Sequence, residues 1–314
     1  MRIAQIMLAK QFGGAERSFV DLSVALAARG HQVLAIVEQR SVASKFLKGK
    51  AGIELQKVHC RGVWDWLCRA RMQRCLVKFM PELTHTHLAR AALLGGAAAR
   101  AYGIPTVAKT HNLVDLKYYK NIDVLVPTTR EQQRYLLSQG IAESAQMLIP
   151  NFCAMEPPEC APVSRTPATS ISIKTLGRFV YKKGFDLLLR AFAMLLDDGM
   201  DVELTLGGDG PEVRQLRSLA GVLGVGHRVT FSGWVDDVQK FLSDAQLFVL
   251  PSRDEPFGIV LLEAMACGVP IVSTRASGPN EILDENTAFF ADLDDAEQLA
   301  ETIKRAIHNP DEAK

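Results

Sequence analysis

The chain has 314 residues, of which 48% are hydrophobic and 23% are charged, and its formal net charge is +1. This composition is that of a soluble globular protein, and the length predicts two domains because single hydrophobic cores stop growing at about 250–300 residues. No uninterrupted apolar segment approaches the roughly 18 residues that span a bilayer, and the first residues lack the apolar stretch and cleavage site of a signal peptide.

The charges are divided unequally between the two halves. Residues 1–150 contain 21 Lys and Arg against 10 Asp and Glu, a net charge of +11, whereas the remainder contains 15 against 25, a net charge of −10. A basic first domain predicts an anionic partner, either a pyrophosphate-linked acceptor or an anionic membrane surface. Charge alone leaves nucleic acid open. The six cysteines show no CxxC or metal-finger spacing, so we expect reduced thiols in the cytoplasm.

In chain order, the first half alternates apolar strands with amphipathic helices. The predicted strands are Ile3–Leu8, His31–Val37, Ile53–Val58, Leu83–His87, Pro105–Lys109, Asp123–Pro127 and Gln146–Ile149. The predicted helices are Glu16–Arg29, Ala89–Ala101 and Thr128–Gln139. This alternation predicts a doubly wound, mainly parallel sheet.

Five prolines between residues 150 and 167 interrupt the pattern and predict a linker over residues 151–170. A second series follows, with strands Ile171–Gly177, Val202–Gly207, Arg228–Phe231, Leu247–Leu250 and Val269–Val272. Its helices are Phe185–Leu196, Pro211–Leu223, Val238–Leu242, a helix opened by Pro256, and Asp295–Ile307. We therefore expect an α/β protein with two Rossmann-like domains, residues 1–150 and 171–314, facing a central cleft.

Phosphate-binding chemistry is predicted where the first strand of the second domain ends. Arg178 offers a planar fork of donors, and Lys183 adds a cation at a helix start, where backbone N–H groups also favour an anion. An ordinary solvated loop is the alternative. Gly208, in the next glycine-rich turn, permits a ligand to approach the backbone closely, although many such turns need glycine only to turn.

Two carboxylates follow another buried strand of this domain. Glu255 lies on a loop and Glu263 on the helix after it. Phe257 and Gly258, between them, are expected to contribute to the same donor-binding site. In the absence of a metal-ligand cluster nearby, the carboxylates are expected to hold hydroxyl groups, which indicates sugar chemistry. The alternatives are a helix-terminal charge for Glu255 and a surface residue for Glu263.

Taken together, these motifs resemble the retaining GT-B-fold glycosyltransferases known as family 4 or group 1. The resemblance rests on motifs in the family order: Gly13-Gly14-Ala15-Glu16-Arg17, Gly177-Arg178, Lys183-Gly184, Gly207-Gly208-Asp209-Gly210-Pro211, Phe231-Ser232-Gly233, Glu255-x7-Glu263 and Gly268-Val269-Pro270. It covers nearly the whole chain but is not specific for one substrate. Family members continue into helices that cross back to the first domain, and these are absent before residue 314.

The resemblance implies roles for the matching residues. Arg178 and Lys183 would neutralise the donor diphosphate, Glu255 would bind hydroxyls of the donor sugar, and Glu263 would bind the ribose. His111 resembles the family histidine near the anomeric centre, with an uninvolved loop histidine as the alternative. The implied reaction moves a sugar from a nucleotide-diphosphate sugar to a glycan or lipid-linked acceptor. It needs no metal, no other cofactor and no nucleic acid.

The first domain is expected to bind the acceptor. Gly13 and Gly14 would bring backbone N–H groups to the donor phosphate or to the acceptor, although a plain turn is the alternative. His87 is a candidate acceptor contact, whereas His85, on the same strand face, is interpreted as core or strand edge. These two histidines lack a third metal ligand at suitable spacing.

A basic segment with two tryptophans, residues 61–79, predicts a helix with an apolar stripe against the core. The second interpretation places Trp64 and Trp66 in an anionic membrane surface, with the enzyme peripheral to the inner face of the cytoplasmic membrane. For the whole chain, the alternatives are a nucleotide-sugar epimerase of the same fold and a non-catalytic nucleotide-binding partner subunit. An NAD-dependent oxidoreductase is disfavoured because no GxGxxG follows the first strand.

Overall fold

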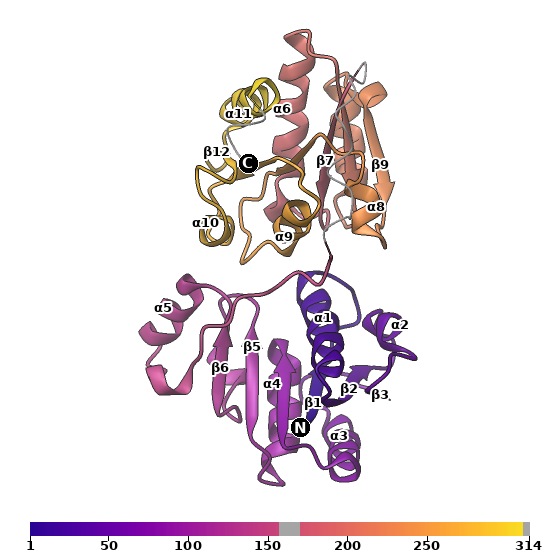
Figure 1. Cartoon of the computed structure of the whole chain (residues 1–314), viewed down its shortest axis with the longest axis vertical. Helices are drawn as coiled ribbons and strands as arrows, with labels where there is room; N and C mark the ends of the chain where they lie inside the picture. The colour runs from indigo at the N-terminus through magenta and orange to yellow at the C-terminus, as the bar shows by residue number, and fades with distance from the viewer. Residues whose placement is uncertain (157–169, 310–314) are drawn as a thin grey trace. The chain divides into compact units, whose positions relative to one another are not determined.

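The computed structural model describes residues 1–156 and 170–309 and forms two compact units, Met1–Ala154 and Met155–Lys314 (Figure 1). Most of the predicted linker, residues 157–169, lies outside the described residues, as do residues 310–314. Each unit has its own sheet and its own hydrophobic cores.

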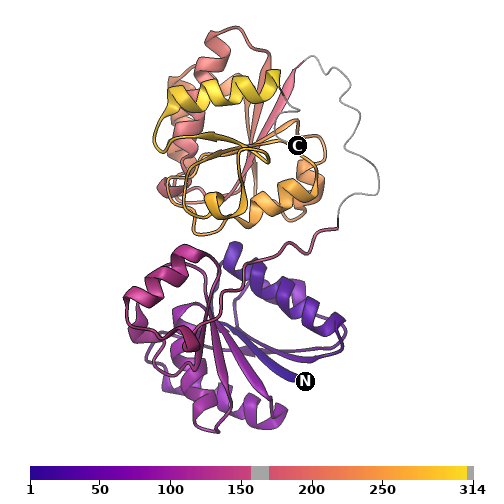
Figure 2. The ribbon, with the colours of Figure 1, turned by 60° about the vertical axis from the view of Figure 1, so that its left-hand side comes forward.

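The first unit contains a six-stranded sheet in the order β3-β2-β1-β4-β5-β6, in which all paired strands are parallel. Its twist is visible in Figure 2. The strands are β1 (Arg2–Met7), β2 (Gln32–Glu38), β3 (Ile53–Val58), β4 (Leu83–His87), β5 (Thr106–Thr110) and β6 (Val124–Pro127). Their side chains are largely buried because helices cover both faces of the sheet.

Alternation along β1 divides the core of this unit between the two faces. Ala4 and Ile6 pack with α3 and α4, whereas Met7 packs with α1 and α2. The helices are α1 (Gly14–Ala28), α2 (Ala43–Leu47), α3 (Trp66–Phe79), α4 (Leu88–Arg100) and α5 (Arg130–Ser138). Short 3₁₀ helices cover Leu116–Tyr118 and Glu143–Ala145.

The second unit repeats the arrangement with the sheet order β12-β11-β10-β7-β8-β9, again parallel throughout. The strands are β7 (Ile171–Leu176), β8 (Val202–Gly207), β9 (Val229–Gly233), β10 (Leu247–Leu250), β11 (Ile271–Thr274) and β12 (Phe289–Ala291). The helices are α6 (Phe185–Asp197), α7 (Val213–Val222), α8 (Val238–Leu242), α9 (Ile259–Ala266), α10 (Pro279–Ile282) and α11 (Ala296–His308). Further 3₁₀ turns cover Tyr181–Lys183 and Gly226–Arg228.

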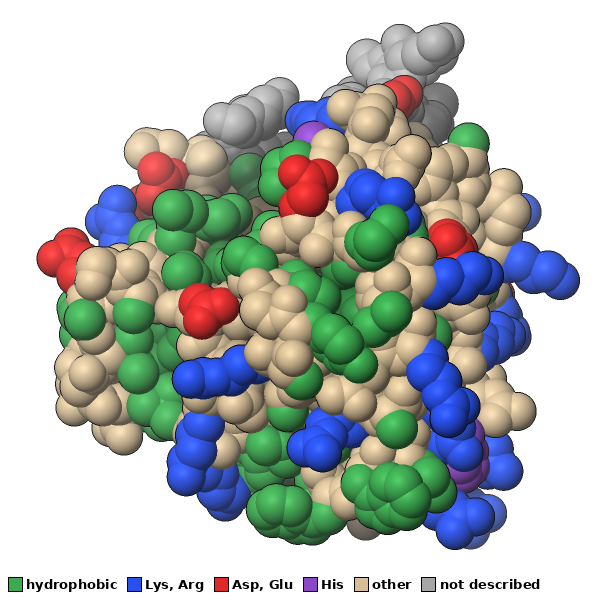
Figure 3. Space-filling view, turned by 90° about the horizontal axis from the view of Figure 1, so that it is seen from below, with side chains coloured by type: hydrophobic (Ala, Val, Ile, Leu, Met, Phe, Trp, Pro, Cys, Tyr) green, Lys and Arg blue, Asp and Glu red, His purple; other side chains and the backbone are tan. Residues whose placement is uncertain are grey.

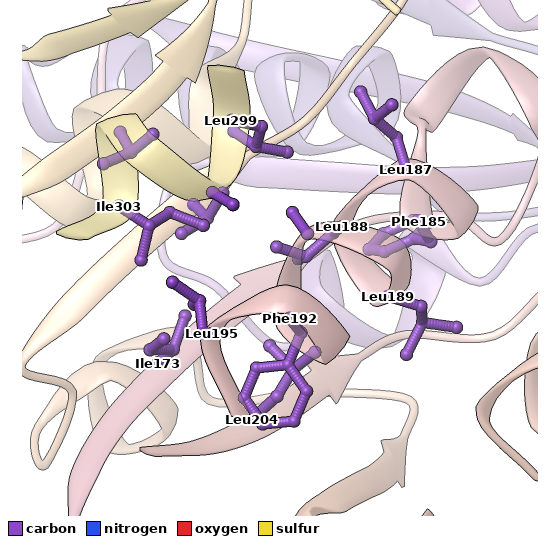
Figure 4. Packing of buried hydrophobic residues seen from close by; sticks show 14 of the residues in the cluster. Ile173, Phe185, Leu187, Leu188, Leu189, Phe192, Leu195, Leu204, Leu299 and Ile303 are labelled. Atoms are coloured by element: carbon purple, nitrogen blue, oxygen red, sulfur yellow. The ribbon is translucent and has the colours of Figure 1, made fainter. Parts of the chain in front are cut away.

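The larger core of the second unit lies beneath α6 and α11. Phe192 and Leu195 of α6 meet Ile303 of α11 and the strand residues Ile173 and Leu204, all fully buried (Figure 4). A second cluster, which includes Phe248 and Leu261, covers the opposite face. The sheet is therefore fixed from both sides, which gives its strand ends and the loops after them a rigid base.

The structure corrects the sequence-based elements at several places. Gln146–Ile149 forms a single bridge with β6 rather than a strand, since β6 ends at Pro127, which has no N–H to continue the ladder. The helix expected to open at Pro256 begins at Ile259, because Gly258 adopts a left-handed conformation (φ 95°) before it. The sequence interpretation also missed α2, α10 and β12, which are only 3–5 residues long.

Both sheets reverse their strand order at one point, between β1 and β4 in the first and between β7 and β10 in the second. In open parallel sheets, ligands bind outside the carboxyl ends of the strands at such a switch point. The loops after these four strands are therefore the natural places for a site.

Candidate active site

Two loops meet at the switch point of the second sheet. One follows β7 and runs from Gly177 to Gly184, and the other follows β10 and runs from Pro251 to Gly258. The backbone N–H groups of Arg253 and Asp254 donate to the carbonyl of Lys182 at 2.8 and 3.1 Å. We call these segments the β7 loop and the β10 loop.

Lys183 and Glu255 form an ion pair between the two loops. Both side chains are largely removed from solvent, with 20% of Lys183 and 8% of Glu255 exposed. Lys183 was predicted for the diphosphate and Glu255 for the sugar, and the structure places the two charges in contact. A bound ligand would therefore meet a cation and a carboxylate held together in one place.

Arg178 lies on the same loop as Lys183, but its side chain is exposed. Within residues 1–156 and 170–309, its guanidinium makes no ion pair or side-chain hydrogen bond. Gly208, after β8, lies directly against the β7 loop, because a Cβ added to it would stand 1.9 Å from the carbonyl oxygen of Gly177. Arg178 thus presents five unengaged N–H donors beside a glycine turn.

Arg253, which the sequence analysis did not single out, ties the β10 loop to its surroundings. Its guanidinium donates to both carboxylate oxygens of Asp186, at 2.7 and 2.9 Å, and also pairs with Asp294. It lies 4.1 Å from the ring centroid of Tyr181. Burial would raise the pKa of Asp186, but the hydrogen bonds and charge of Arg253 lower it overall. This clamp joins the β10 loop to the β7 loop and to the start of α6.

The remaining predicted donor-site residues follow Glu255. Phe257 is buried, Gly258 provides the left-handed turn before α9, and Glu263 lies on α9 with only 6% of its surface exposed. The N–H of Gly278 donates to the carbonyl of Glu255 at 2.8 Å, which holds this stretch in place. The second unit therefore gathers Arg178, Lys183, Gly208, Glu255, Phe257 and Gly258 in loops at one edge of its sheet.

In the first unit, the predicted histidines belong to one hydrogen-bonded cluster. His87 Nδ1 lies 3.1 Å from His111 Nε2, and His87 Nε2 lies 2.8 Å from Gln5 Oε1. Gln5 Nε2 lies 3.3 Å from His85 Nδ1. His87 is fully buried with both ring nitrogens engaged, so a direct contact with an acceptor would require one of these bonds to break.

Burial also determines the charge state of this cluster. It lowers the pKa of His87 and of His111 well below the usual value, and the charges of neighbouring groups, including Lys109, add to the effect. The pKa of His85 falls to about 3, and burial lowers that of Lys109 to about 8. At neutral pH the three imidazoles are therefore uncharged.

Gly13 and Gly14 lie at the start of α1, in the loop after β1. The neighbour of β1 on one side of the sheet is β4, so this loop lies at the switch point of the first sheet. Gly13 is the N-cap residue in extended backbone and has no side chain with which to cap the helix. The first turn also carries the carboxylate of Glu16, whose Oε2 would stand 3.4 Å from a Cβ added to Gly13. In the part of the chain that the structure describes, no helix is long and apolar enough to cross a membrane, and no group of three His, Cys, Asp or Glu side chains is arranged to hold a metal ion.

Comparison with known proteins identifies the family. The profile of "Glycosyl transferases group 1" matches residues 161–314, and that of "Glycosyltransferase Family 4" matches residues 12–156. The chain is 33% identical to each of two lipopolysaccharide core biosynthesis glycosyltransferases of Rhizobium meliloti, LpsD and LpsE. These alignments cover 95% and 94% of this chain and 86% of each relative.

Solved structures agree on the fold. Anabaena HepE, solved in complex with UDP and glucose, superposes with a TM-score of 0.85 at 20% identity, over 100% of this chain and 91% of HepE. WaaG, a glycosyltransferase involved in lipopolysaccharide biosynthesis, gives a TM-score of 0.77 at 20% identity, over 99% of this chain and 91% of WaaG. The fold, the ordered motifs and the relatives thus lead to one conclusion: the chain belongs to the group 1, or family 4, glycosyltransferases of the GT-B fold.

Proposed function

We propose that this protein transfers a hexose from a nucleotide-diphosphate sugar to a hydroxyl of a cell-envelope glycan or lipid-linked acceptor, with retention at the anomeric carbon. The observation that carries the proposal is the Lys183–Glu255 ion pair at the switch point of the second sheet, with exposed Arg178 on the same loop. The relatives LpsD and LpsE are lipopolysaccharide core biosynthesis glycosyltransferases, which favours a lipopolysaccharide-type acceptor, and the UDP complex of HepE favours a uridine donor.

In this proposal the side chains divide the donor between them. Arg178 and Lys183 would bind the diphosphate, on which negative charge develops as it leaves, and such preorganised charge stabilises the transition state. Glu255, held by Lys183, would accept hydrogen bonds from hydroxyls of the sugar, and Glu263 would accept them from the ribose. Because these cations supply the neutralising charge, we expect no metal requirement and an unchanged rate in EDTA.

Retention would follow from a front-side displacement. The bond between the anomeric carbon and the phosphate oxygen breaks, and a bond to the acceptor oxygen forms on the same face. The acceptor proton passes to the leaving phosphate oxygen, so no covalent nucleophile is needed. His111 is proposed to lie near the reacting carbon, as the family resemblance implies.

A donor panel assayed by nucleotide release tests this function, with lipopolysaccharide-core and lipid-linked acceptors and donor-only controls. Arg178→Ala should lower kcat by about 10²–10³-fold, because it removes one preorganised donor to the developing charge. Arg190→Ala, which removes an exposed arginine of α6, is the matched control and should leave kcat unchanged. Near-normal turnover of Arg178→Ala would refute the assignment.

The anomeric configuration of the purified product, read from its NMR coupling constants, tests retention separately. A product of inverted configuration would exclude the front-side displacement. In reactions without acceptor, an epimerised donor would instead favour the epimerase alternative.

We also propose that the first unit rests on an anionic membrane surface. The buried side of α3 packs Cys68, Met72 and Leu76 into the core, so the predicted apolar stripe has an ordinary explanation. Core packing does not explain Trp64 and Trp66, since 85% and 68% of their surfaces are exposed. Figure 3 shows a face of the molecule on which apolar side chains lie beside many lysines and arginines. Exposed tryptophans next to basic residues suit a membrane interface.

Flotation with vesicles of phosphatidylglycerol or of phosphatidylcholine tests the membrane proposal. We expect binding to the anionic vesicles only, with weaker binding at high salt. Trp64→Ser with Trp66→Ser should reduce binding, whereas Trp234→Ser, on an exposed tryptophan of the second unit, should not. Equal binding of all variants, or none by the native protein, would contradict the proposal.

A further inference from the structure

A chain of hydrogen bonds beneath α1 connects Gln5, in the middle of β1, through the buried ring of His87 to His111. Gln5 and His87 are both fully buried. They come from neighbouring strands, and Gln5 is paired in register with His85, two residues before His87. Because side chains two residues apart share a strand face, Gln5, His85 and His87 project to the same side of the sheet.

The donor and acceptor atoms determine which residue donates in each hydrogen bond of this series. The side-chain oxygen of Gln5 can only accept, so the Nε2–H of His87 donates to it at 2.8 Å. His87 is a neutral imidazole, which leaves its Nδ1 without a proton. That nitrogen can then only accept, and the Nε2–H of His111 donates to it at 3.1 Å.

The last ring therefore has one defined tautomer. With the proton on Nε2, the Nδ1 of His111 keeps its lone pair. Within the described ranges, no side-chain or backbone group donates a hydrogen bond to that nitrogen. His111 is also only half-buried, whereas His87 is fully enclosed. The chain thus ends in a hydrogen-bond acceptor on a half-buried residue.

The surroundings hold the rings in place. The ring of His87 lies nearly parallel to those of His85 and His111, at centroid distances of 4.5 and 5.3 Å, and the edge-on ring of Phe19 lies 5.3 Å away. Leu88, the next residue, has a positive φ of 68°, which is strained for a non-glycine residue. A strained turn and a buried polar chain at a sheet's switch point indicate a constrained site rather than a plain core.

We propose that Gln5 and His87 are positioning residues that fix His111 as the Nε2–H tautomer, so that its Nδ1 accepts a hydrogen bond from a substrate hydroxyl. Gln5 acts through His87 and touches no substrate. The part played by the substrate hydroxyl rests on the proposed function, whereas the tautomer itself does not. Buried partners of this kind commonly set the ring orientation and proton position of a functional histidine.

NMR of the full chain with ¹⁵N-labelled histidine tests the tautomer directly, through long-range correlations between ring protons and ring nitrogens at neutral pH. The His111 signals are assigned by comparison with His111→Phe. We expect a protonated Nε2 and an unprotonated Nδ1 for both His87 and His111. A proton on Nδ1 of His111 would overturn the proposal, because it requires the reverse direction along the chain.

Variants test the positioning role. Gln5→Leu removes the acceptor for His87, so we expect His111 to populate both tautomers and kcat to fall on the order of 10–100-fold, with an unchanged Kd for UDP. If Gln5→Leu fails to fold, His87→Phe makes the same test. His85→Phe is the matched control, because it removes the other partner of Gln5 but leaves the chain to His111 intact.

The outcomes separate the two proposals. A shifted tautomer in Gln5→Leu with unchanged kcat would overturn the positioning role. If the expected tautomer were found but the native protein transferred no sugar from any donor, the proposed function would fail and the tautomer assignment would stand.

Discussion

Among single residues, Lys109 is unusual because it is a buried cation with no counter-ion among the described residues. It lies on β5 opposite His87 and is 3% exposed, and its side chain makes no ion pair or hydrogen bond with any part of the chain that the structure describes. Lys174 on β7 is also buried, but its ammonium donates to the carbonyl of Phe241 at 2.7 Å and pairs with Asp244 at 2.5 Å. The two lysines therefore allow a matched comparison.

Replacing Lys109 by methionine should stabilise the protein at pH 7. Its pKa of about 8, lowered from 10.5 by burial, corresponds to a penalty on the charged form of up to ~3 kcal/mol. Between pH 8 and 10.5 the unfolded chain holds this proton while the folded chain has released it, so the contribution of Lys109 to the unfolding free energy becomes more favourable as the pH rises. Urea unfolding at pH 7 and pH 10 should show a gain for Lys109→Met that shrinks with pH.

Replacing Lys174 by methionine should have the opposite effect on the unfolding free energy. Lys174→Met leaves a carbonyl unsatisfied and should destabilise by about 1–3 kcal/mol. A loss of stability at pH 7 in Lys109→Met would show that the lysine has a stabilising partner.

Sequence position alone predicted where several candidate residues lie. Arg178, Lys183 and Glu255 lie in the loops that follow β7 and β10, and the strand ends of a parallel sheet share one edge. Arg253 was not predicted, because its role in joining the two loops depends on a contact with Asp186, 67 residues away along the chain. Gln5 could have been recognised as a candidate from the sequence, since it is the one polar residue within the apolar stretch Ile3–Met7. No sequence rule, however, predicts which buried polar partner such a residue meets.

At the scale of elements, the β7 and β10 loops depend on a glycine at their contact. Gly184 has φ 66° and precedes α6, and a Cβ there would stand 1.9 Å from the carbonyl oxygen of Pro251. Gly199, after α6, has a similar φ of 80°, but no heavy atom lies within 4 Å of its added Cβ. The positive φ would strain any L-residue at either position. Only at Gly184 would the added Cβ also collide with neighbouring backbone.

Gly184→Ala should therefore lower both stability and activity, whereas Gly199→Ala should lower stability alone. The positive φ costs roughly 1–2 kcal/mol at either position. At Gly184 the β10 loop must also move, and it carries Glu255 away from Lys183. Urea unfolding and kcat for the two variants measure this difference. Equal activity of the two would mean that the loops can separate without consequence.

The missed elements share a physical reason. β12 and α10 contain three and four residues, which is too short for periodicity to distinguish strand, helix or loop. β12 forms because Phe289 and Phe290 pack on opposite faces of an existing sheet, against the larger core and the second cluster respectively. Longer segments such as β1 and α6 can be recognised from their own pattern of apolar residues, whereas these short ones take their structure from their neighbours.

At the scale of the whole molecule, the chain contains two separately built cores. The clusters around Phe19 and Met72 contain only residues of the first unit, and those around Phe192 and Phe248 contain only residues of the second. The charge divides in the same way, with +11 over residues 1–150 and −10 over the rest. Stability and ligand binding should therefore be assignable to each unit separately.

Hydrogen exchange followed by mass spectrometry should resolve the two units. Phe192→Ala and Phe19→Ala each remove a fully buried ring and should cost about 3–5 kcal/mol. Because the cores are separate, the loss of hydrogen-exchange protection in each variant should be confined to the unit that carries the substitution. Under the proposed function with a uridine donor, UDP at a hundredfold excess over its Kd should raise the protection of the second unit by as much as about 2.7 kcal/mol, since a ligand stabilises what it binds. Loss of protection across both units in either variant would show that they unfold as one. Protection of the first unit alone by UDP would move the nucleotide away from Arg178 and Lys183.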